Sequence, residues 1–218
     1  MSDFVVDALD DTTGVLLHNH DGSLGADWSK HPALSSTMSI RFTSNRIYPN
    51  LLGSSSSPIA YLASGIPNGA EYDIEFDYYQ MDGYGNFGVI ARASRTAKTW
   101  YHFYHGAGSG STQQWVIALH VNGSVVSSWT SNQTLSNATN YLCKFEIRNA
   151  TKKGYVWDGA MWDEVISTTN NTITAAGGVG VRSAFQYGDN EGKQIGSFEA
   201  TDLSTPSAGS TGILLIGD

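Results

Sequence analysis

The chain has 218 residues, a formal net charge of −8 and a pI near 5.1. This length suits one large all-β domain, and the acidic balance disfavours nucleic acid or an anionic membrane as a partner, because both need a basic surface. Twenty-four glycines and only 15% charged residues favour short strands and tight turns over helices.

The first forty residues predict two strands and a long loop. The opening MSDFVVDALDD lacks the regions of a signal peptide, so we expect a protein made in a cytoplasm. Short apolar runs predict strands near Phe4 and over 13–18. In the loop that follows, His18 and His20 stand two positions apart, but no third ligand completes a zinc pattern. We therefore expect turn histidines and no metal site there.

Further strands are predicted over 38–44 and 58–64, and then comes the clearest pattern in the chain. From Glu71 to Tyr78, acidic and apolar residues alternate strictly, which indicates a strand with one buried and one wet face. A polar turn follows, and 87–93 predicts a return strand, so the segment 70–93 is expected to form a long antiparallel hairpin. That pairing would place Arg92 beside Glu75 as a cross-strand ion pair.

The remaining chain continues as strands and turns. Strands are predicted over 99–105 and 114–122, and Asn122-Gly123 and Asp158-Gly159 predict hairpin turns because these residues tolerate positive φ. Cys143 shares an alternating face with Phe145, which favours a buried, inert thiol. About thirteen strand candidates without a helical period predict two antiparallel sheets packed face to face.

The chain ends in a segment of different composition. Residues 1–203 are predicted to form the domain, and 204–218 a linker followed by an apolar tail. We expect this tail to dock on a neighbouring chain or along its own sheet edge. Its apolar residues are Ile213, Leu214, Leu215 and Ile216.

The segments GAEYDIEFDYY, GNFGVIARAS, KGYVWDG and AAGGVGVRSAF, in this order, resemble concanavalin A-like lectin/glucanase domains of the LamG-like kind. The resemblance implies a jelly roll of two curved sheets, a concave face that often binds glycans, and pairing of the strand near Phe4 with the last strand near Phe198. Residues 7–28 further resemble the start of such domains in tailed-phage virion proteins. Calcium is also possible, because Asp10, Asp11 and Asp202 could meet where these two strands pair.

Glu71, Asp73 and Glu75 spell ExDxE, which is similar to the catalytic strand of laminarinase-type glycoside hydrolases. There the first glutamate is the nucleophile, the aspartate tunes it and the last glutamate is the acid/base. Strand rise separates the two glutamates by about 13–14 Å, whereas a retaining mechanism needs carboxyl groups about 5–5.5 Å apart. Long side chains on a curved strand could close this gap, but an acidic stripe is also typical of a solvated strand face. We expect no enzyme.

Tyr101 and His105 are expected to share a face with Arg92, while Trp100, His102 and Tyr104 take the other face. Aromatic rings and a guanidinium on a concave sheet would suit sugar stacking and hydroxyl hydrogen bonds. Trp157 is a candidate rim aromatic of the same glycan site. The alternative is that most of these aromatic residues belong to the core.

These observations favour a non-enzymatic assembly protein, a virion surface or decoration subunit with possible glycan binding. It would be made in the host cytoplasm and assemble with other virion subunits or with further copies of itself. A stand-alone carbohydrate-binding module and a laminarinase-type hydrolase are the alternatives.

Overall fold

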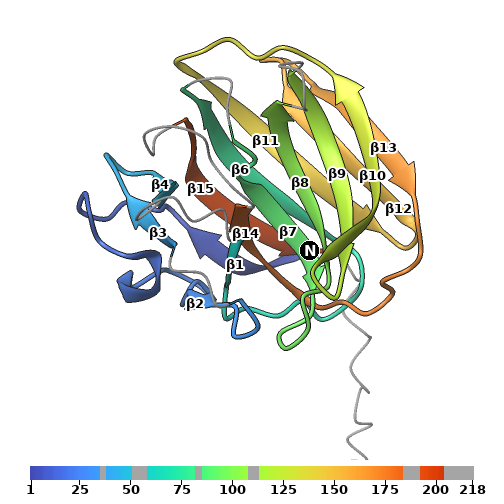
Figure 1. The fold of residues 1–218 in the computed structure, drawn as a ribbon, viewed down its shortest axis with the longest axis horizontal. Coiled ribbons are helices and arrows are strands. Elements are labelled where there is room, and N and C mark those ends of the chain that lie inside the picture. Colours follow the sequence, from blue (N-terminus) through green and yellow to red (C-terminus); the bar gives the residue numbers. More distant parts are fainter. Residues whose placement is uncertain (35–37, 51–57, 82–84, 108–112, 184–191, 204–218) are drawn as a thin grey trace, which may run out of the picture.

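The computed structural model describes residues 1–34, 38–50, 58–81, 85–107, 113–183 and 192–203, which form two antiparallel sheets packed face to face (Figure 1). The eight-stranded sheet runs in the order β13 (Trp162–Thr169), β12 (Thr151–Trp157), β11 (Thr139–Arg148), β6 (Tyr72–Gln80), β15 (Lys193–Asp202), β4 (Ile47–Asn50) and β3 (Ser39–Phe42), and β1 (Ser2–Asp7) also pairs with β15. The seven-stranded sheet runs in the order β10 (Ser124–Asn132), β9 (Gln113–Val121), β8 (Trp100–Ala107), β7 (Gly88–Ala93), β14 (Gly178–Ser183), β5 (Ile59–Leu62) and β2 (Ser29–Lys30). This arrangement confirms the predicted all-β, two-sheet jelly roll.

Strand β6 has the two faces that its alternation predicts. Tyr72, Ile74, Phe76 and Tyr78 are at most 1% exposed and pack into the main core between the sheets. Burial of each large apolar side chain contributes about 1.5–3 kcal/mol. The acidic residues between them lie on the outer face of the eight-stranded sheet.

The predicted hairpin is wrong, because β6 and β7 belong to different sheets. β6 pairs with β11 and β15, and β7 pairs with β8 and β14. Arg92 is therefore buried and does not pair with Glu75, whose register partners are Lys144 on β11 and Glu199 on β15. The pattern misled because all six residues of β7 are buried, so alternation there does not separate a dry face from a wet one.

Several local predictions are confirmed. Asn122 and Gly123 have φ of 52° and 90° and form the turn between β9 and β10. β1 pairs with β15, with Asp7 opposite Phe198. Cys143 is buried, and burial raises the pKa of its thiol well above the ordinary value.

Other local predictions fail at short, irregular segments. The strand expected over 13–18 is instead a turn that leads into a 3-10 turn, η1 (Leu17–Asn19). β4 lies within what the sequence predicts to be an irregular excursion, and its proline makes it hard to recognise.

Among the described residues, no helix is long and apolar enough to cross a membrane. The tail from Ile213 to Ile216 lies outside the described residues, so its docking stays a prediction.

Candidate functional site

The outer face of the seven-stranded sheet carries a group of polar and aromatic side chains, here called the outer-face cluster. It consists of Trp100, His102 and Tyr104 on β8, His120 on β9 and Arg182 on β14. The intervening β8 residues point into the main core, so strand alternation places this set on the opposite face. Trp100 is 1% exposed, His102 0%, His120 3% and Arg182 4%, whereas Tyr104 is half-buried.

A hydrogen bond and ring contacts join the cluster. Arg182 Nη1 donates to Nδ1 of His102 over 3.0 Å, and its guanidinium carbon lies 5.6 Å from the centre of the Trp100 ring. The His102 ring stacks on Tyr104 with centroids 4.4 Å apart, and the His120 ring lies 5.7 Å from Trp100. An arginine can only donate, so Nδ1 of His102 accepts and the proton of the neutral ring sits on Nε2.

The cluster carries a positive charge that comes from Arg182 alone. Burial and the Arg182 charge hold the pKa of His102 well below its ordinary value and lower that of His120 to about 3. Both imidazoles are therefore neutral near pH 7. Burial also lowers the pKa of Arg182, to about 10, which leaves its guanidinium charged.

Four nitrogens of the cluster have no hydrogen-bond partner within the part of the chain that the structure describes. They are Trp100 Nε1, His102 Nε2, His120 Nδ1 and Arg182 Nε. A buried polar group without a partner costs about 1–3 kcal/mol. Four such groups on one sheet face indicate a place where a polar ligand or ordered water completes the hydrogen bonds.

A glycine separates Arg182 from Tyr104 on this face of the sheet. Register places Gly88 directly between them, opposite Arg182 on β14 and opposite Tyr104 on β8. A Cβ at Gly88 would lie 2.2 Å from the Phe103 carbonyl oxygen and 2.6 Å from Cβ of Tyr104. The close approach of the strands therefore requires glycine at this position, which is itself buried.

The structure places three of the predicted glycan-binding residues in the interior. Arg92, Tyr101 and His105 share a face as expected, but it is the face between the sheets, where all three are buried. Arg92 Nη2 donates to the Ala70 carbonyl over 2.9 Å, and His105 Nε2 lies 2.7 Å from the Gln133 carbonyl oxygen. These side chains point between the two sheets and bond to groups of the protein itself, so they lie away from the outer sheet faces.

Trp157 lies apart from those three residues. It is 38% exposed at the end of β12, on the eight-stranded sheet, and its ring meets Trp162 edge-on with centroids 5.4 Å apart. Lys144 Nζ lies 4.4 Å from the Trp162 ring centre. Trp157 is thus an exposed aromatic residue, as predicted, but on a different sheet.

The ExDxE residues belong to the outer face of the eight-stranded sheet. Asp73 Oδ1 lies 2.9 Å from Arg148 Nη1, and this charge contact occupies the middle carboxylate. Burial is the main cause that raises the pKa of Glu75, and neighbouring carboxylates including Glu199 add to it, whereas Lys144 opposes the shift.

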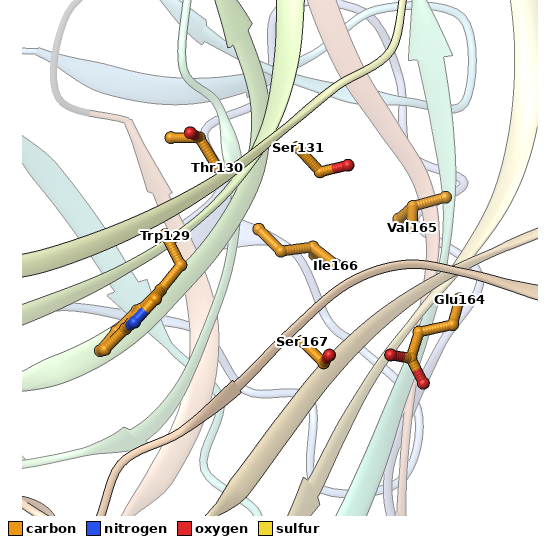
Figure 2. Close-up of a pocket in the computed structure, with 7 residues that line it drawn as sticks. All are labelled: Trp129, Thr130, Ser131, Glu164, Val165, Ile166 and Ser167. Atoms are coloured by element: carbon orange, nitrogen blue, oxygen red, sulfur yellow. The ribbon is translucent and has the colours of Figure 1, made fainter.

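A groove of about 390 Å³ opens between the edge strands β10 and β13 (Figure 2). This edge groove is lined by Trp129, Thr130, Ser131, Glu164, Val165, Ile166 and Ser167. Its volume falls in the range of about 300–1,000 Å³ found for ligand sites. Among its described lining residues, Glu164 has the one carboxylate, and this accepts a 2.7 Å hydrogen bond from Lys153, so these residues offer hydroxyl groups and one indole rather than a free charge.

The predicted calcium ligands do not come together. Asp202 lies opposite Ser2 at the start of β1, whereas Asp10 and Asp11 follow the other end of that strand. Asp11 instead contacts His20 over 3.1 Å. Among the described residues, no three His, Cys, Asp or Glu side chains gather as a metal site, so these donors do not fit calcium.

The outer-face cluster is a feature that the sequence pattern alone does not assign. Trp100, His102 and Tyr104 stand at every second position of the sequence, and this alternation of aromatic side chains indicates that they share one strand face. Arg182 and His120 come from strands far away in sequence, and only the sheet order β9-β8-β7-β14 brings them there.

No family model and no curated sequence matches the chain. Among solved structures, the carbohydrate binding module CBM66 from Bacillus subtilis superposes with a TM-score of 0.56 at 17% identity, covering 80% of this chain and 92% of that one. The VIP36 exoplasmic/lumenal domain in its Ca2+/Man3GlcNAc-bound form gives 0.59 at 9%, covering 93% and 89%. A native glycosidic hydrolase gives 0.56 at 14%, covering 88% and 96%. At these identities the likeness concerns the fold: the chain has the jelly-roll sandwich that lectin-like domains share.

Proposed function

We propose that this protein binds glycans without acting on them, and that the outer-face cluster is the binding site. The observation that carries the proposal is the set of four buried nitrogens without partners beside the rings of Trp100 and Tyr104. Sugars present hydroxyl groups for such nitrogens and C–H faces for aromatic rings. The carbohydrate binding module CBM66 and the VIP36 domain with bound Man3GlcNAc share this fold and support the proposal.

A glycan array followed by calorimetry on the best ligand tests the proposal. His102→Leu removes an unpartnered donor while keeping a side chain of similar size, and we expect it to abolish binding. Trp157→Ala, on the other sheet, is the matched control and should bind normally. Thermal unfolding of both variants establishes that they fold. Absence of binding to every glycan, or a loss confined to Trp157→Ala, would contradict the proposal.

The proposed binding does not use calcium, because Asp202 pairs with Ser2 at the start of β1 whereas Asp10 and Asp11 follow the other end of that strand. Binding should therefore survive a chelator such as EDTA. Calcium-dependent binding would show that other oxygen ligands complete a metal site.

A laminarinase-type hydrolase is the second candidate, and one observation favours it. Burial raises the pKa of Glu75, which is the direction that a general acid needs. Against it, Arg148 engages Asp73, and strand spacing separates Glu71 from Glu75 by about 13 Å. Hydrolysis predicts release of reducing sugar from β-glucans that Glu71→Gln abolishes, whereas we expect no release from the wild-type protein.

We further infer from the resemblance of residues 7–28 that the protein is a virion surface or decoration subunit, made in the host cytoplasm. The apolar tail from Ile213 to Ile216 would attach it to other subunits or to further copies. Native mass measurement and binding to phage particles test this role. A monomer that does not bind capsids or tail parts would contradict this role. So would a chain truncated after Leu203 that assembles normally.

A further inference from the structure

We propose that the outer-face cluster selects acidic glycans by binding the carboxylate of a sugar acid. This inference rests on the proposed glycan binding and specifies its ligand class. It follows from the kind of hydrogen-bonding groups in the cluster, from their charge and from the half-buried Tyr104 beside them.

The unpartnered groups are mostly donors. Trp100 Nε1 can only donate, and so can Arg182 Nε. His102 Nε2 carries the ring proton, because Nδ1 accepts the hydrogen bond from Arg182, so it is a third donor. A neutral sugar hydroxyl both donates and accepts, whereas a carboxylate only accepts and offers about four lone-pair sites. Three donors without acceptors therefore match a carboxylate better than a hydroxyl group.

The charge of the cluster points to the same ligand. Arg182 is 4% exposed, and none of the ion pairs within the described residues includes it. Among the residues that the structure describes, the charges that act on Arg182, His102 and His120 come from one another and from Tyr104, and none of them belongs to a carboxylate. A buried guanidinium without a counter-ion is costly, and a ligand carboxylate would supply that counter-ion.

Tyr104 is the member of the cluster through which a ligand would meet it. Gly88 lies between Arg182 and Tyr104 in the sheet, and Tyr104 is half-buried whereas the other four members are at most 4% exposed. In this proposal a sugar ring stacks on Tyr104, whose own ring covers His102, and its carboxylate pairs with the guanidinium of Arg182. The planar fork of an arginine matches a carboxylate in two parallel hydrogen bonds.

The decisive comparison uses the wild-type protein. An array of sialylated, uronate-containing and neutral glycans identifies the best ligand, and calorimetry then compares that acid with its methyl ester, which lacks the charge and carries one added methyl group. We expect the acid to bind at least about tenfold more tightly, because hydrogen bonds to charged groups are the stronger ones. Equal affinity for acid and ester, or binding of neutral glycans only, would overturn the acidic selectivity and leave the proposed function standing. No binding at all would overturn both.

Variants locate the effect. Arg182→Gln should lower the affinity for the acid by at least about tenfold and change the affinity for the ester much less. Lys144→Gln removes the same charge from the outer face of the other sheet and should change neither affinity. A loss of the acid preference in Lys144→Gln instead would overturn the assignment to Arg182.

Discussion

Nε2 of His20 lies 2.9 Å from Oδ1 of the buried Asp7, and the other ring nitrogen of His20 lies 3.1 Å from Oδ2 of Asp11. Asp7 also accepts a 2.6 Å hydrogen bond from the indole of Trp28. This network joins the end of β1 to the loop before β2. Burial opposes charge on the imidazole, but the hydrogen bonds and charges of Asp7 and Asp11 outweigh it and raise the pKa of His20.

The network predicts a pH-dependent stability. A histidine whose pKa is raised in the folded state stabilises the fold fully below its unfolded pKa of about 6.5, and this contribution is lost as pH rises through the folded pKa. The stability difference between the wild-type protein and His20→Gln should therefore be larger at pH 5.5 than at pH 8.5. Urea unfolding at both pH values measures it, with His18→Gln as control because that ring contacts the Tyr61 hydroxyl. A difference that is independent of pH would refute the assignment.

Lys152 is expected to be a structural residue of the interior. Its ammonium donates to the carbonyls of Asn149, Ala150 and Asn170 over 2.7–3.1 Å and lies 4.6 Å from the centre of the Tyr101 ring. Lys152→Met would leave these carbonyls without their donor and should lower the free energy of unfolding by about 1–3 kcal/mol.

The neighbouring Lys153 provides the matched control for Lys152. It makes a surface ion pair with Glu164, so Lys153→Met should lower the free energy of unfolding by less than about 1 kcal/mol. Denaturant unfolding of both variants checks the prediction. Equal losses would show that the buried hydrogen bonds of Lys152 are not what stabilises this end of the sandwich.

The structure leaves no space for a side chain at Gly154, so we expect substitution there to destabilise the fold. A Cβ there would lie 2.3 Å and 2.5 Å from two ring atoms of Phe103 and 2.8 Å from Ile166. The Phe103 ring is stacked against Phe145 and cannot move without disturbing the core. Gly154→Ala should therefore lower the free energy of unfolding by about 1–3 kcal/mol, which is typical of overpacking in a core. Gly178→Ala is the control, because its Cβ would have no neighbour closer than 3.7 Å and should lower the melting temperature little.

The sequence could predict what depends on neighbours along the chain. The alternation from Tyr72 to Tyr78 and the Asn122-Gly123 turn specify a strand and a turn wherever the chain lies in space. It could not predict which sheet receives each strand, because a polar turn after β6 is compatible with a hairpin and with a crossing between sheets. The same limit applies to the site. Alternation separates Trp100 from Tyr101 but does not say which of them faces the core.

The low pKa values of the cluster histidines predict that glycan binding is insensitive to pH over the range where histidines usually titrate. His120 has a pKa of about 3 and that of His102 is well below its ordinary value, so both rings stay neutral between about pH 5 and 8. Affinity should therefore be constant across this range and change only under more acid conditions, where His120 and the carboxylate of an acidic glycan protonate. Calorimetry at several pH values measures this, and His120→Gln removes the contribution of the histidine to any change on the acid side. A midpoint near pH 6.5 would mean that a solvent-exposed histidine, rather than the buried pair on β8 and β9, controls binding.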